Sequence, residues 1–440
     1  MKETGVREPP RTLFGSLRAI GPSMILTANI VGSGELIMTT ALGAAAGFTA
    51  LWVILVSCAV KVAVQLEFGR HAIASGETTL LAFNSLPGPR LRGASAVVVA
   101  WLAAKLLQLL QMGGIVGAVA LAMNIALPWA PPAVWAWTCG LAASLLVWRG
   151  SYGFIERTAV ALTAVFSLVT MFCAVSLQWT PYRIESSMIA EGLAFELPAA
   201  AAGVAVAAFG LTGVSADEII SYPYWCIEKG YGTWVGPRDG SAEWTKRARG
   251  WIRVMYVDAI ASMLIYTAAT AAFYVLGAAV LHGRSEVPEG ARIIEVLSGI
   301  YTETLGPGAS GLFLAGAVTV LFSTLFINCA SSTRMFADAF AQLGLFRYAD
   351  KPVRDRWFGA LAWILPTSWT LLYLYVQEPL FMVTFGGVVL AALLLVVAYA
   401  AQHFRYRRLP AELRPSRTYD ALLWASILAI VAVGLRALLI

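Results

Sequence analysis

Three carboxylates lie inside long apolar stretches of this sequence. Glu35 follows a Gly-Ser-Gly triplet in "NIVGSGELIMTT", and Asp217 and Glu218 lie in "LTGVSADEII". An uncompensated acid in hydrocarbon costs several kcal/mol, so such residues are rare and have a partner. The three acids therefore predict a bound cation, a proton or a basic partner.

Small residues before the acids predict that the helices around them are interrupted. Gly32, Gly34 and Gly213 tolerate backbone conformations that other residues avoid. Non-helical backbone at membrane depth is tolerated where it lines a cavity, and its free carbonyls can coordinate a cation. The predicted cation ligands are Glu35, Glu218, Asp217, Gly32, Thr212 and Ser215.

Each candidate ligand also has a structural interpretation. Glu35 and Glu218 could instead accept hydrogen bonds from free amides at half-helix N-termini. Asp217 lies one position further round the helix and could face elsewhere. Thr212 and Ser215 are either hydroxyl ligands or residues that pack between helices.

Three further charged residues are candidate counter-ions or proton carriers. Lys105 is either the counter-ion of the acids or a side chain that reaches the membrane interface. Arg253 and Asp258 share one helix and predict a salt bridge at its cytoplasmic end, with a proton exit as the alternative.

Composition places these residues in a polytopic membrane protein. The chain has 440 residues, of which 59% are hydrophobic and 13% charged. Soluble proteins carry about 25% charged residues. Eleven spans are predicted near 19–46, 50–70, 95–127, 131–148, 154–177, 195–222, 251–281, 309–333, 357–376, 379–402 and 419–440.

The loop charges predict the orientation of the chain. If the N-terminus is cytoplasmic, the cytoplasmic segments hold 25 of the 31 Lys and Arg residues. This bias is the positive-inside pattern, so we expect a multi-pass protein of the inner (cytoplasmic) membrane with its C-terminus outside. The basic residues then face the lipid bilayer surface, and no nucleic-acid partner is expected.

An internal repeat indicates how the spans are organised. "VGSGELI" in the first span and "VSADEII" in the sixth have corresponding positions in two sets of five spans. Since five is odd, the two sets have opposite orientations, which is typical of transporters with a site between interrupted helices. We therefore expect a single domain over 1–440, with inverted repeats at 15–178 and 195–403 and an extra helix at 419–440.

Several segments resemble the Nramp family of proton-coupled divalent-metal transporters. They include "GPSMILTANIVGSGELIMTTALGAAAGF", "LWVILVSCAVKVAVQLEFGRHAIASGETTL", "RGWIRVMYVDAIASMLIYTAATAAF" and "STLFINCASSTRMFADAF", which are similar to the first, second, seventh and eighth helices of that family. The resemblance covers most of spans 1–10. It implies an all-α LeuT-type fold of two inverted five-helix repeats, here followed by an eleventh helix.

The candidate site departs from the family pattern. The family's DPGN motif falls on Gly32, Ser33, Gly34 and Glu35, which replaces its ligand Asp by Gly and its ligand Asn by Glu. The family's sixth-helix Met falls on Ser215, so the thioether that favours soft metals is lost. Oxygen ligands favour hard ions such as Mg²⁺ or Mn²⁺.

The expected function is therefore secondary transport of a divalent cation by alternating access, with the site between unwound helices 1 and 6. The alternative is a carrier of a small organic solute such as an amino acid or amine, because "VGSGE" is similar to the GSG turn of amino acid–polyamine–organocation carriers. An enzyme is not expected, since no His cluster, Ser–His pair or phosphate loop is present. No cofactor is expected, and a monomer is compatible with the sequence.

Overall fold

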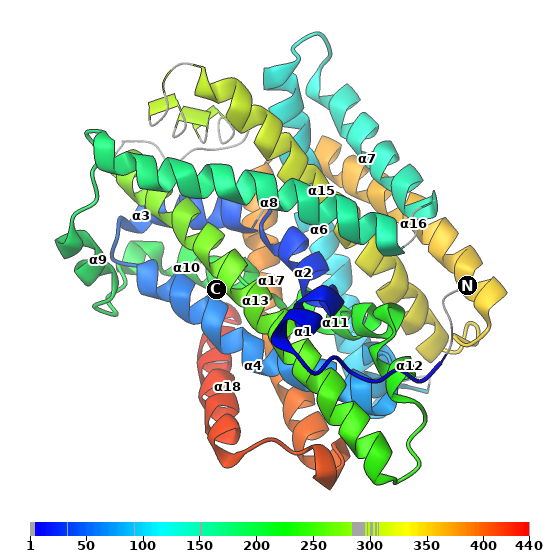
Figure 1. Ribbon diagram of the computed structural model, residues 1–440. Helices are drawn as coiled ribbons and strands as arrows, with labels where there is room; N and C mark the ends of the chain where they lie inside the picture. Colours follow the sequence, from blue (N-terminus) through cyan, green and yellow to red (C-terminus); the bar gives the residue numbers. More distant parts are fainter. Residues whose placement is uncertain are drawn as a thin grey trace.

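The long apolar segments of the chain form helices. The computed structural model describes residues 5–439 apart from 33, 92, 150–151, 284–294, 297, 300–301, 304–305 and 307. Within them, the long helices are α4 Leu51–Ser75, α6 Ala96–Ala126, α7 Pro132–Arg149, α8 Tyr152–Ser176, α13 Ala242–Leu281, α15 Ala309–Gln342, α16 Lys351–Val376, α17 Pro379–His403 and α18 Arg417–Ala437 (Figure 1).

Helices occupy all eleven ranges that were predicted to span the membrane. In the described residues, eight segments are long and apolar enough to cross a bilayer, and a bent pair, Pro22–Ile30 with Gly34–Ala46, makes a ninth. The two other predicted spans fall on α7 and α8. Nine of the eleven predicted spans thus coincide with segments that are long and apolar enough to cross a bilayer, and the other two coincide with shorter apolar stretches of α7 and α8 in the described residues.

Short elements connect the long helices and build the two breaks. The single hairpin in the described residues pairs β1 (Arg90–Leu91) with β2 (Ala94–Ser95). The short helices are α1 Leu13–Ala19, α2 Pro22–Ile30, η1 Gly34–Thr39, α3 Thr40–Ala46, α5 Thr79–Asn84, η2 Leu177–Trp179, α9 Ser186–Gly192, η3 Ala199–Ala201, α10 Ala202–Leu211, α11 Ala216–Lys229, α12 Tyr231–Val235, η4 Phe404–Arg408 and η5 Ala411–Leu413.

The first broken helix consists of α2, η1 and α3. Its α2 segment ends at Ile30, and η1 is a π-helical turn that begins at Gly34. A Cβ atom on Gly32 would lie 1.8 Å from Thr324 Oγ1 of α15, so only glycine fits there. Gly34 was predicted to unwind the helix, but it belongs to η1, and the interruption precedes it. Ser33 lies outside the described residues.

The second broken helix consists of α10 and α11. Its α10 segment ends at Leu211, and Gly213 has a φ of +60°, a left-handed conformation that favours glycine. The side chain of Ser215 then accepts a hydrogen bond at the start of α11. The predicted interruption at Gly213 is therefore present.

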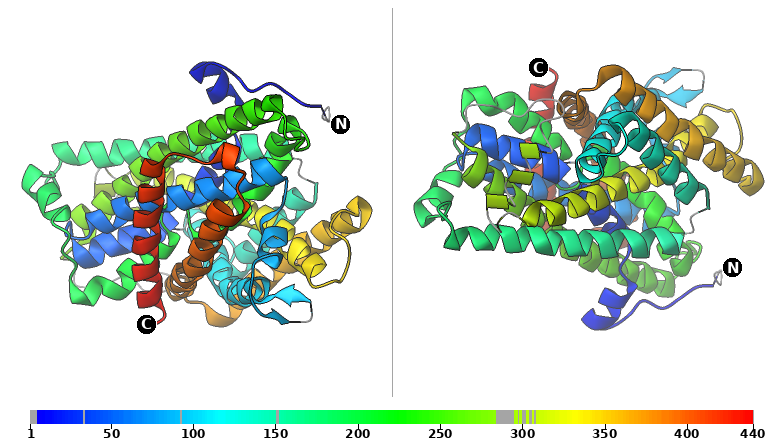
Figure 2. Two further views of the ribbon diagram at one scale, coloured as in Figure 1. Left: turned by 90° about the horizontal axis from the view of Figure 1, so that it is seen from below. Right: turned by 90° about the horizontal axis from the view of Figure 1, so that it is seen from above.

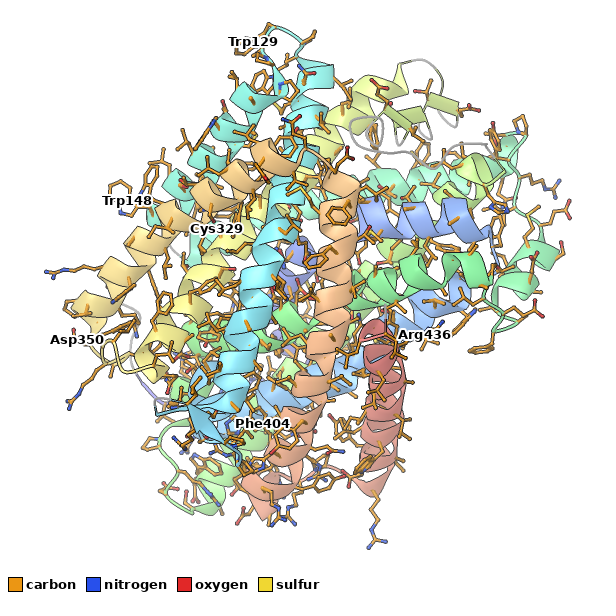
Figure 3. The ribbon with its side chains drawn as sticks, turned by 180° about the vertical axis from the view of Figure 1, so that it is seen from behind. Trp129, Trp148, Cys329, Asp350, Phe404 and Arg436 are labelled. Carbon is orange, nitrogen blue, oxygen red and sulfur yellow. The ribbon has the colours of Figure 1, made fainter. Side chains whose placement is uncertain are left out.

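The two broken helices lie against each other in the middle of the bundle. Helix α2 packs on α11, and η1 packs on α10. Around them, α4 lies along α13 (Figure 1), and α6 lies along α17, as Figure 3 shows from behind. This packing brings residues of both breaks together although they are about 180 positions apart in the sequence.

The N-terminal segment is bound to the surface of α12 and α13 (Figure 2). The Arg7 amide donates to Trp234 O at 2.9 Å, and Trp251 Nε1 donates to Arg7 O at 3.0 Å. Arg253 donates to Pro10 O at 2.6 Å.

The predicted salt bridge between Arg253 and Asp258 is wrong. Asp258 is fully buried and accepts hydrogen bonds from the amides of Gly21 (3.0 Å) and Ser23 (2.7 Å). It therefore caps α2, because the first amides of a helix have no partner within the helix. The sequence could not predict this, since the two groups are more than 230 residues apart.

Asp258→Ala should lower the thermal stability of the purified protein, because it leaves two buried amides of α2 without acceptors. Loss of such a cap costs about 0.5–2 kcal/mol. Arg253→Ala is the control and should have little effect, since Arg253 contacts a backbone carbonyl at the surface. Melting curves in detergent measure both, and equal losses would favour the salt bridge instead.

Candidate functional site

A small polar cavity lies where the two broken helices meet. Its volume is about 20 Å³. One water-sized sphere needs about 10–15 Å³, so there is room for an ion or a water molecule. The cavity is lined by Asn29, Ile30, Gly34, Gln108, Gln111, Met112, Leu211, Ser215, Asp217, Glu218, Thr324, Asn328 and Leu390.

Glu218 joins the two broken helices at the cavity. One carboxylate oxygen accepts from the Ser215 amide at 2.9 Å, and the other accepts from Asn29 Nδ2 of α2. Ser215 Oγ accepts in turn from the Asp217 amide at 3.2 Å. Ser215 and Glu218 thus form a capping box, in which each side chain satisfies an amide at the helix start. Glu218 therefore accepts a hydrogen bond from a free amide at a half-helix N-terminus, which is the structural alternative given above. Its carboxylate also lines the cavity.

Two asparagines complete this side of the cavity. Asn328 Nδ2 of α15 donates to Asn29 Oδ1 at 2.7 Å. Both side chains are more than nine-tenths buried. Sequence reasoning missed them, although Asn29 stands within the stretch that drew attention to Glu35. The sequence signal that could have identified them is a carboxamide side chain within an apolar span.

Asp217 forms an ion pair with Lys105 of α6. The exposed fractions of the two side chains are 11% and 3%. Lys105 Nζ also donates to Gln108 Oε1 at 3.3 Å. In the described residues, Asp217 Oδ1 and Gln108 Nε2 are buried without a hydrogen-bond partner. Lys105 is thus a counter-ion at this cavity, and two polar atoms beside it lack protein partners.

Glu35 lies in a second polar cluster, next to the cavity but not in its lining. One carboxylate oxygen accepts from the Gly213 amide and from Thr270 Oγ1, each at 3.1 Å. The other oxygen, Oε2, has no partner in the part of the chain that the structure describes. A carboxylate of the first break therefore bonds a free amide of the second.

Lys61 is the cation of this second cluster. Its ammonium, on α4, donates to Thr212 O and, at 2.6 Å, to Phe209 O. Thr212 Oγ1 shares a hydrogen bond of 2.8 Å with Ser57 Oγ. Sequence reasoning noted Lys61 only as a basic residue within a span and assigned it no role.

The structure divides the predicted ligand set. Asp217, Glu218 and Ser215 line the cavity, whereas Glu35 and Thr212 belong to the second cluster. Gly32 packs against Thr324 of α15 instead. Over the described residues, no group of three His, Cys, Asp or Glu side chains is arranged to hold a metal.

The lining contains a sulfur atom that the sequence analysis did not place there. Met112 of α6 is 3% exposed and lines the cavity. Ser215, at the position of the family's sixth-helix Met, is the α11 cap. A thioether therefore lines the cavity from α6, and not from the start of α11, where the family has its Met.

Two interrupted helices that cross at a buried polar cavity define a transporter of the LeuT-type fold. Residues 23–440 match the family described as natural resistance-associated macrophage protein-like, or Nramp. The chain therefore belongs to the Nramp-like family of membrane transporters and is not an enzyme. No curated protein sequence matches the chain significantly.

Solved structures show the same fold. A manganese transporter from Eremococcus coleocola, in complex with an aromatic bis-isothiourea substituted compound, is 14% identical with a TM-score of 0.68, over 98% of this chain and 88% of that one. The nucleobase-cation-symport-1 family transporter Mhp1, with bromovinylhydantoin bound, has 14% identity and a TM-score of 0.62, over 96% and 91%. MhsT, in complex with L-phenylalanine, has 17% identity and a TM-score of 0.58, over 98% and 100%.

Lys105→Met should destabilise the protein more than the double variant Lys105→Met/Asp217→Asn. Removal of one partner leaves a buried charge unpaired, which costs about 3–5 kcal/mol, whereas removal of both charges avoids this cost. Melting temperatures of the wild type, both single variants and the double variant measure the effect. Additive losses would mean that the two charges do not interact.

Proposed function

We propose that this protein is a secondary transporter that moves a divalent cation of the Mg²⁺ or Mn²⁺ class by alternating access. The observation that carries the proposal is the oxygen-rich cavity between the two helix breaks. The manganese transporter with the same fold supports a metal substrate. A site built by one chain is also compatible with a monomer.

The charges around the cavity support a cation as substrate. Asp217 is paired with Lys105, and Glu35 shares its cluster with Lys61. Glu218 receives only neutral hydrogen-bond donors. When all five groups are ionised, they carry one negative charge in excess, which a cation would compensate.

The ligand types support a hard ion. Mg²⁺ loses its water shell reluctantly and is bound through one or two carboxylates, with water as the remaining ligands. Glu218, the carboxamides of Asn29, Asn328 and Gln111, and water would supply such a shell. Met112 would add affinity for softer ions such as Cd²⁺ if its sulfur reached the ion. A cavity of about 20 Å³ has no room for an amino acid, so the organic-solute alternative is disfavoured.

Glu218→Gln should abolish metal uptake without unfolding the protein. A glutamine still completes the capping box, so this change removes the charge and keeps the cap of α11. Uptake of Mg²⁺, Mn²⁺, Cd²⁺ and an amino-acid panel into proteoliposomes measures the effect. We expect at least a tenfold loss for Mg²⁺ and Mn²⁺.

Glu412→Gln is the matched control, since Glu412 is about half exposed and distant from the breaks. Normal metal uptake by Glu218→Gln would show that the carboxylate only caps α11 and does not bind the metal. Uptake of an amino acid and of no metal would overturn the proposed function. A preference for Cd²⁺ over Mg²⁺ would replace the hard-ion class by a soft one.

We also propose that the N-terminus is cytoplasmic, in the inner membrane, and that the C-terminus lies outside. The distribution of Lys and Arg among the loops supports this orientation. Residues 15–178 and 195–403 would then be the two repeats, with α18 as an additional helix. A reporter placed after α18 should be active only outside the cytoplasm, and one placed in the α16–α15 connection, near Asp350, only inside. The reverse pattern would contradict the orientation.

A further inference from the structure

The ammonium of Lys61 lies among backbone carbonyls that could also bind a small cation. The last carbonyls of a helix have no partner within the helix and carry the negative end of its dipole. At the end of α10, the carbonyls of Phe209 and Thr212 are such groups, and the Lys61 ammonium donates to both. Lys61 is fully buried.

Further oxygen atoms surround the same point. Ser57 Oγ lies 3.2 Å from each of the carbonyls of Phe209 and Thr212, and 2.8 Å from Thr212 Oγ1. Glu35 binds the adjacent Gly213 amide and interacts electrostatically with Lys61. Two carbonyls, two hydroxyls and a nearby carboxylate form an oxygen set of the kind that holds Na⁺ at broken transporter helices.

We propose that Lys61 is a tethered cation, whose ammonium permanently fills an alkali-cation site at the end of α10. Because the charge is covalently fixed to α4, it cannot leave when the transporter changes conformation. Uptake of the substrate then needs no Na⁺ or K⁺ at this position. The inference rests on the second polar cluster and is independent of which ion the cavity transports.

The energetics favour this interpretation over a simple salt bridge. A buried ammonium costs several kcal/mol unless other groups compensate its charge. Here the direct hydrogen bonds go to neutral carbonyls, as they do for a bound metal cation, and not to a carboxylate. The partnerless oxygen of Glu35 leaves one more potential ligand.

Removal of the ammonium should therefore create a site for a dissolved alkali cation. Lys61→Ala and Lys61→Ser both remove the charge and leave space beside the carbonyls. Lys61→Met is the matched control, since its side chain fills much of the space without charge. Melting temperatures are measured in NaCl, KCl and choline chloride at equal ionic strength.

For the wild type, we expect equal melting temperatures in all three salts and equal substrate uptake with Na⁺ or choline outside. Lys61→Ala and Lys61→Ser should melt at lower temperature in choline and regain stability with Na⁺ in a saturable way. Lys61→Met should show no such recovery. Lys61→Ser keeps the test valid if Lys61→Ala does not fold.

Folded Lys61→Ser or Lys61→Ala protein with the same stability in Na⁺ and choline would overturn the proposal. Saturable Na⁺ dependence of the wild type's stability would also overturn it, because the site would then not be filled. Neither measurement needs a divalent ion, so failure of this inference and failure of the proposed metal transport are distinguishable.

Discussion

Backbone groups freed at a helix break must find partners, because the membrane interior supplies no water to bond them. Three buried charged side chains of this protein meet that requirement. Glu35 accepts from Gly213, Glu218 from Ser215, and Lys61 donates to carbonyls at the end of α10. The second break is therefore stabilised by a side chain of the first break, by a lysine of a neighbouring helix and by the first turn of its own α11.

In this arrangement Glu218 stabilises the start of α11 and can still bind a substrate. A carboxylate has about four lone-pair sites, and the capping box and Asn29 use only part of that capacity in Glu218. Its remaining capacity faces the cavity. Glu35 differs, since it lies beside Lys61 and outside the lining. The two acids look equivalent in the sequence and have different surroundings in the structure.

Each of the two polar clusters contains one lysine, and the electrostatic interaction of Lys61 reaches Glu218 as well as Glu35. Lys105 compensates Asp217 beside the cavity, and Lys61 supplies a positive charge to the cluster that contains Glu35. Each lysine comes from a helix outside the broken pair, α6 and α4 respectively. The two lysines thus offset part of the three negative charges that a count of acids suggests.

The sequence by itself determined the membrane class, the helix positions and the place of both interruptions. Hydropathy and glycine placement are local properties, and Gly32 and Gly213 lie at the breaks as expected. Only the tertiary structure decided which polar groups meet. The partner of Asp258 proved to be the start of α2, and Asn328 reached Asn29, because contacts between distant segments depend on how helices pack and not on spacing along the chain.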